Sequence, residues 1–200
     1  MANGAAPKAN PAALGLVGFG LTTVLLSSIN AGVLPAAGEN VVIPLAMAFG
    51  GTIQLIAGGL EAKSENTFGM TAFFSYGAFW WWFALLLLLG RCHILDLAGT
   101  AATTGVALLL WGVLTLYLWV STFALSRLLL LVFFTLWVTF FLLGAGLLFA
   151  QPMLTHLGGW TGLLCGALAM YGSFAITTNA TFGRTVLPTG APAIRTKSSD

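Results

Sequence analysis

Six long apolar runs, separated by short polar breaks, constrain this chain more than any other feature of its sequence. A helix needs about 20 predominantly apolar residues to cross the hydrocarbon core of a bilayer. The runs have roughly this length and cover residues 12–29, 41–60, 69–90, 98–121, 128–150 and 154–176. Charged residues make up 6% of the chain, against about 25% in soluble domains. The sequence therefore predicts an all-α integral membrane protein, a bundle of six transmembrane helices.

The polar ends and the basic residues predict domain organisation and orientation. We expect an N-terminal cytoplasmic segment at residues 1–11, a six-helix transmembrane domain at 12–178 and a cytoplasmic C-terminal tail at 179–200. Six crossings place both termini on one side, and basic residues favour the cytoplasmic side. The side of the membrane that holds the termini also holds Lys8, Lys63, Arg127, Arg184, Arg195 and Lys197, whereas the opposite side holds Arg91. We therefore expect a plasma (inner) membrane protein with both termini in the cytoplasm.

Motifs of enzymes and cofactor proteins are missing from the sequence. There is no H-E-x-x-H, C-x-x-C or G-x-S-x-G, and His93 and His156 are far apart. All lysines lie outside the apolar runs, which excludes a retinal Schiff base inside the membrane. The net charge of +2 is too small and too scattered to indicate nucleic acid binding. We expect no enzyme activity, no cofactor and no metal.

Glu61 and Gln54 are the polar pair in the second run that could carry chemistry. They are seven residues apart and therefore share a helix face. One hypothesis makes Gln54 part of a pore lining and Glu61 a proton site or a vestibule site. The alternative is an interfacial carboxylate paired with Lys63 and an amide that holds two helices together.

Hydroxyl side chains at helical spacing are the next candidates for a pore lining. They are Thr22 and Thr23 in the first run, Thr71 and Ser75 in the third, and Thr139 in the fifth. A narrow, uncharged pore with hydrogen-bond donors suits a small carboxylate or its neutral acid better than a metal ion. The alternative is that each hydroxyl donates to a carbonyl of its own helix.

Small residues indicate close helix packing in the last run. Gly158, Gly162 and Gly166 form G-x-x-x-G-x-x-x-G, a spacing that lets helix backbones approach closely in membranes. The pattern predicts a packing face, either within one protomer or between protomers.

Residues 10–16 read N-P-A-A-L-G-L, which resembles the N-P-A-P-L-G-L signature of the acetate uptake transporter family, also called succinate–acetate permeases. Ala13 departs from the usual Pro. Further matches lie at residues 18–20, 30–32, 50–51, 54, 57–58, 60–61, 66–69, 71–73, 75–77, 159–160 and 182–188. The resemblance covers the chain from about residue 9 to 188.

This resemblance implies a six-helix protomer within a ring-shaped homohexamer, with one pore per protomer. It also implies a hydrophobic constriction at Phe19, Tyr76 and Leu136. At a rise of about 1.5 Å per residue, these three lie about 11–13 Å from the same membrane edge, near the middle of a core of about 30 Å. The family signature also gives Asn10 a functional role beside plain helix capping.

We accordingly expect a channel or transporter for acetate and related small monocarboxylates, with succinate as a further substrate. The constriction residues act as a gate, and the expected pore-lining residues are Asn10, Thr22, Thr23, Asn30, Gln54, Thr71, Ser75 and Thr139. A passive anion channel and proton-coupled transport both remain open. The rival hypothesis is a non-transporting membrane sensor or assembly scaffold.

Overall fold

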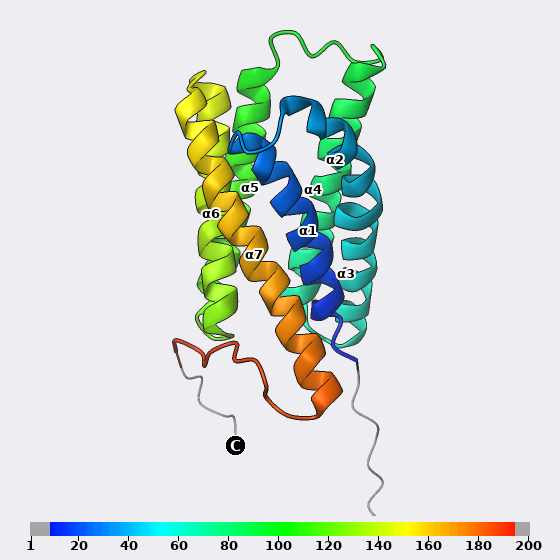
Figure 1. Cartoon of the computed structure of the whole chain (residues 1–200), viewed down its shortest axis with the longest axis vertical. Helices are drawn as coiled ribbons and strands as arrows, with labels where there is room; N and C mark the ends of the chain where they lie inside the picture. Colours follow the sequence, from blue (N-terminus) through cyan, green and yellow to red (C-terminus); the bar gives the residue numbers. More distant parts are fainter. Residues whose placement is uncertain (1–8, 195–200) are drawn as a thin grey trace, which may run out of the picture.

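Six membrane-length spans form the protein, in agreement with the sequence (Figure 1). The computed structural model describes residues 9–194. Within that range the helical segments are α1 (Ala12–Asn30), η1 (Ala36–Gly38), α2 (Glu39–Leu45), η2 (Ala46–Ile53), α3 (Gln54–Lys63), α4 (Thr67–Arg91), α5 (Ala101–Thr122), α6 (Arg127–Leu148) and α7 (Pro152–Phe182). The last helix is longer than the apolar run 154–176 that predicted it. The expected all-α, six-span architecture is confirmed.

The second span is interrupted in its middle by a π-helix. It runs over Ala36–Lys63 and consists of η1, α2, the π-helix η2 and α3. Pro44 lies at the end of α2 and lacks a backbone N–H, so it removes one α-helical hydrogen bond just before η2 begins. π-Helical turns occur frequently at functional sites, and Gln54 is the first residue after this one.

Glycines let α7 pack closely against α1. A Cβ atom added at Gly159 would lie 2.2 Å from the backbone nitrogen of Ala31, and one at Gly162 would lie 2.2 Å from Ser27 Oγ. Gly166 faces the Gly20 carbonyl oxygen in the same way, at 2.9 Å. The small-residue face of the last run therefore packs within the protomer, which settles the alternative that the sequence left open.

The helix contacts form a ring that is open between α4 and α5. α7 also contacts α6, α6 contacts α5, and α3 contacts α4. The backbones of α4 and α5 stay apart over most of their length. Aromatic side chains bridge the space, for example Phe79 and Trp111, whose ring centroids are 5.4 Å apart. The α4–α5 side is thus joined through side chains instead of close backbone contact.

A C-terminal strap, residues 184–194, crosses the end of the bundle where both chain ends lie (Figure 1). Asn179 anchors its start, because the side-chain oxygen accepts from the N–H groups of Val186 and Leu187 and the amide donates to the Leu187 carbonyl. Farther along, Leu128 N donates to the Thr189 carbonyl at 3.0 Å and Ile194 N donates to the Phe123 carbonyl at 2.9 Å. The strap therefore links α7 to the α5–α6 connection.

Candidate functional site: two cavities and a constriction

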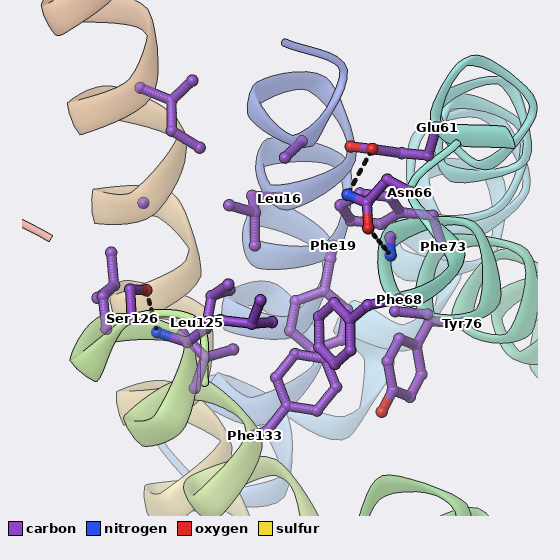
Figure 2. A pocket seen from close by; sticks show the side chains of 18 of the residues that line it. Leu16, Phe19, Glu61, Asn66, Phe68, Phe73, Tyr76, Leu125, Ser126 and Phe133 are labelled. Atoms are coloured by element: carbon purple, nitrogen blue, oxygen red, sulfur yellow. Dashed lines mark hydrogen bonds between the residues drawn. The ribbon is translucent and has the colours of Figure 1, made fainter. Parts of the chain in front are cut away.

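A cavity of about 250 Å³ opens toward the end of the bundle that carries both chain ends, and we call it the terminal cavity. The start of α1, the end of α3, the starts of α4 and α6 and the end of α7 surround it. Ser126 and Thr189 place the α5–α6 connection and the strap in its wall. Figure 2 shows Glu61 and Asn66 on one side of this cavity and Leu125 and Ser126 on the other.

The three predicted constriction residues come together in the wall of the terminal cavity. Phe19, Tyr76 and Leu136 are 5%, 3% and 4% exposed. The Phe19 and Tyr76 ring centroids are 5.7 Å apart, and the Tyr76 and Phe133 centroids are 6.1 Å apart. Phe68 packs on Phe133 at 5.1 Å, so the rings form one cluster in Figure 2. Three helices thus contribute the residues at which the sequence places the gate.

A second cavity of about 300 Å³ lies on the other side of this level, and we call it the distal cavity. Its wall includes Phe79, one turn beyond Tyr76, and Phe140, one turn beyond Leu136. At about 1.5 Å per residue, the nearest lining residues of the two cavities are about 5–6 Å apart along α4 and α6, and about 10 Å apart along α1, from Phe19 to Leu26. The two cavities therefore lie on opposite sides of the level that holds the three predicted constriction residues.

Two polar side chains of α3 are buried in the wall of the terminal cavity. Gln54 is 0% exposed, and neither its amide nitrogen nor its amide oxygen has a hydrogen-bond partner among residues 9–194. Glu61 is 2% exposed; Oε2 accepts from Asn66 Nδ2 at 2.8 Å, whereas Oε1 has no partner in the same range. Unsatisfied buried polar groups are costly. Both side chains therefore have hydrogen-bonding capacity that no residue in this range uses.

Asn66 holds Glu61 and starts α4 at the same time. Its side-chain oxygen accepts from Gly69 N at 3.1 Å, which is an N-cap hydrogen bond, while its amide binds the carboxylate. The sequence had placed Asn66 in a family motif without a role. The structure places it, like Phe68 and Phe133, in the cavity wall. Phe133 carries no signal beyond its position one turn before Leu136.

The hydroxyl side chains that were predicted to line a pore do not face either cavity. Thr22 Oγ1 donates to the Gly18 carbonyl at 2.9 Å, and Thr23 Oγ1 donates to the Phe19 carbonyl at 2.7 Å. Thr139 Oγ1 donates to the Thr135 carbonyl at 2.8 Å. These three, with Thr71 and Ser75, lie outside the walls of both cavities. Thr22, Thr23 and Thr139 thus bond to their own helix, as the alternative describes, and Thr139 Oγ1 also bonds to Thr161 Oγ1 on α7 at 2.9 Å. A part in a pore stays a prediction for all five residues.

The two predicted asparagines lie at opposite cavities. Asn10 lines the terminal cavity, and its side-chain oxygen accepts from Ala12 N at 3.0 Å. Asn10 therefore caps the start of α1 and faces the cavity at once. Asn30 lines the distal cavity at the end of the same helix. The positions of Asn10 and Asn30 are compatible with a pore-lining role, which remains a prediction for both.

Charge in the cavity walls is acidic rather than basic. Of the described residues that line the two cavities, none is Lys or Arg, and each cavity has one carboxylate, Glu61 or Glu39. Glu39 Oε2 pairs with Arg91 Nη2 at 2.8 Å. Among residues 9–194 no group of His, Cys, Asp and Glu side chains could hold a metal ion. An anion in these cavities would therefore meet amide and hydroxyl groups in the described walls, but no cation.

A six-span membrane protein with two cavities on opposite sides of a buried aromatic cluster has the architecture of a small-solute channel or transporter. Residues 3–190 match the GPR1/FUN34/yaaH family. The chain belongs to that family, which confirms the resemblance found in the sequence.

Individual relatives agree with this assignment. The chain is 44% identical over 182 residues to the succinate-acetate/proton symporter SatP of Escherichia coli (strain K12), covering 91% of this chain and 95% of that protein. It is 39% identical over 172 residues to ammonia transport outward protein 2 of Saccharomyces cerevisiae, covering 84% of this chain and 61% of that one. The solved structure of the bacterial acetate channel SatP superposes with a TM-score of 0.88 at 44% identity, covering 92% of this chain and 100% of that one.

Proposed function

We propose that this protein passes acetate and related small monocarboxylates, and also the dicarboxylate succinate, through the path formed by the terminal cavity, the constriction and the distal cavity. The observation that carries the proposal is the buried amide of Gln54, unpartnered among residues 9–194, in a cavity that ends at Phe19, Tyr76 and Leu136. The relative named as a succinate-acetate/proton symporter and the acetate channel structure support the same substrate class. As with these relatives, we infer a transporter rather than an enzyme.

The substrate crosses the constriction as the neutral acid, so transport is coupled to a proton. A carboxylate ion at the middle of a membrane costs several kcal/mol, and the described cavity walls contain no cation to offset that cost. Glu61, buried beside the same cavity, is placed to exchange a proton with the bound carboxylate. The protein then moves charge-neutral acetic acid across the apolar layer.

We further propose that both termini and the terminal cavity face the cytoplasm of the plasma (inner) membrane. Lys63, Arg127 and Arg184 lie at that end of the bundle, and Arg91 lies at the other. This distribution supports the proposed orientation, because cytoplasmic loops carry an excess of basic residues. Lys8, Arg195 and Lys197 lie outside the described residues. Residues 1–11 and 179–200 then form the cytoplasmic ends of a transmembrane domain at 12–178.

The protomers assemble into a homohexamer with one pore each, as the family resemblance implies. An exposed apolar stripe on α5, which consists of Val106, Leu110, Val113, Tyr117 and Val120, offers a face for lipid or for a neighbouring protomer. Native mass spectrometry of the purified protein in detergent tests this assembly. A monomeric or dimeric mass would contradict it.

Uptake of labelled acetate into proteoliposomes tests the function. We expect the wild type to accumulate acetate when a pH gradient is imposed. Three variants, Phe19→Ala, Tyr76→Ala and Leu136→Ala, should change the rate of acetate uptake. Glu61→Gln should weaken the dependence of uptake on the pH gradient. A parallel arm with ammonium tests the activity named in the yeast relative. If the wild type moves no acetate, the sensor or scaffold hypothesis replaces transport.

A further inference from the structure

The hydroxyl of Tyr76 connects the constriction to a helix that supplies none of the three constriction residues. Phe19 comes from α1, Tyr76 from α4 and Leu136 from α6. Tyr76 Oη donates a hydrogen bond of 3.0 Å to Thr115 Oγ1 on α5. This bond crosses the space where the α4 and α5 backbones stay apart, so it fixes the phenol ring where close helix packing does not.

Thr115 is itself fixed in orientation. It is 0% exposed, and its Oγ1 donates to the Trp111 carbonyl of its own helix at 2.7 Å. Because a threonine hydroxyl has one proton, that donation leaves only lone pairs facing Tyr76. Thr115 therefore acts as an acceptor, and the Tyr76 proton must point toward α5 and away from a solute in the cavity.

The same turn of α5 supports the other side of the barrier. The Trp111 indole packs edge-on against Phe79 at 5.4 Å, and Phe79 packs edge-on against Phe140 at 5.2 Å. Phe79 and Phe140 line the distal cavity, whereas Tyr76 lines the terminal cavity. One turn of α5 thus holds a ring on each face of the layer that separates the cavities.

We propose that Thr115 is a positioning residue that sets the width of the constriction by fixing the Tyr76 ring. This inference rests on the proposed function, because it assigns selectivity to the Phe19–Tyr76–Leu136 level. Without the Thr115 hydroxyl, contacts with Phe19 and Phe133 are left to hold the ring. The ring then pivots more freely, and the barrier discriminates less between acetate and a bulkier monocarboxylate.

The test compares Thr115→Val with Thr115→Ser in proteoliposomes, using labelled acetate and labelled propionate. Valine keeps the shape and loses the hydroxyl, and serine keeps the hydroxyl. We expect Thr115→Val to lower the acetate-to-propionate rate ratio about five-fold, the factor that corresponds to one neutral hydrogen bond. We expect Thr115→Ser to keep the wild-type ratio. The absolute acetate rate of the wild type reports separately on the proposed function.

Thr122 provides a matched control on the same helix. It is also 0% exposed, and its hydroxyl donates to the Trp119 carbonyl of its own helix. Thr122→Val therefore loses an equivalent bond to its own helix without touching Tyr76, and we expect an unchanged rate ratio. Thermal melting of each variant checks that the folds are comparably stable.

A double variant identifies the route of the effect. If Thr115 acts through the Tyr76 hydroxyl, Thr115→Val produces no further change in the rate ratio once Tyr76→Phe is present. The inference is overturned if wild type transports acetate and Thr115→Val keeps the wild-type ratio. It is also overturned if Thr122→Val lowers the ratio equally, or if the effect of Thr115→Val persists in full in the Tyr76→Phe background.

Discussion

Replacing Gln54 by methionine should make the protein more stable and the transporter worse. The side chain is fully buried, and both amide atoms lack a partner among residues 9–194. Leaving one buried polar group unsatisfied costs about 1–3 kcal/mol. Methionine has a similar shape without that cost. An increase of about 1 kcal/mol in the free energy of unfolding raises the melting temperature of a chain of this size by about 2–4 °C.

Transport should change in the opposite direction, and the size of the change reports the charge of the bound species. A hydrogen bond to a neutral partner contributes about 1 kcal/mol, which is a factor of about 5 in KM. A hydrogen bond to an ion contributes about 1.5–3 kcal/mol, a factor of about 10–150. We expect Gln54→Met to raise the KM for acetate about five-fold. Gln54 lies about 10 Å deeper than Glu61 along α3, so in our proposal the substrate that reaches Gln54 has already taken up its proton.

Two measurements on the same purified variant test this reasoning: thermal melting in detergent and the concentration dependence of labelled acetate uptake. Thr122→Val, a buried polar variant outside both cavities, serves as control; it should melt slightly lower and keep the wild-type KM. A lower melting temperature for Gln54→Met would show that the amide is satisfied in the folded protein. An unchanged KM would show that it does not bind substrate.

Two further predictions concern packing and the strap. Gly159→Ala places a methyl group 2.2 Å from the backbone nitrogen of Ala31 and should destabilise the protein by about 3 kcal/mol or more, seen as a lower melting temperature. At Gly59 the nearest atom is 3.9 Å away, so equal destabilisation by Gly59→Ala would refute the steric argument. Asn179→Ala removes three hydrogen bonds to the strap and should speed tryptic release of the strap at least ten-fold. Thr181→Ala, whose hydroxyl bonds only its own helix, is the control, and matching rates would contradict the anchor role.

The sequence predicts the six spans well because lipid leaves few alternatives. A chain with so few charges must satisfy its backbone internally, and helices do so within each segment. The apolar runs therefore mark the helices directly. The π-helix η2 has no comparable signal, since Pro44 is consistent with a kink, a break or a wider turn. The Thr115 contact with Tyr76 spans 39 residues of sequence, and helical periodicity carries no information about it.

The hydroxyl pattern shows where spacing alone does not choose between two interpretations. Thr22 and Thr23 have the spacing of a pore lining, but a threonine in lipid gains a bond from the carbonyl four residues earlier without any help from tertiary structure. Gln54 has a longer side chain and no such bond to its own helix, so its amide needs an outside partner. Inside a membrane helix, a long amide or carboxylate is therefore a stronger indication of a solute site than a hydroxyl.

Differences in packing between the two halves of the bundle bear on how the constriction works. α1 and α7 touch through glycines with no room for a methyl group, so the position of Phe19 on α1 is rigidly determined. The α4 backbone is held against η2, where Gly77 faces the Gly51 carbonyl oxygen. Toward α5, however, α4 is joined by aromatic contacts and by the Tyr76–Thr115 hydrogen bond, so the orientation of the Tyr76 ring depends on a few side chains. When the constriction changes its width, the Tyr76 ring should therefore move before Phe19 does. Selectivity should therefore be more sensitive to substitutions on α4 and α5 than to equally buried substitutions on α1 and α7.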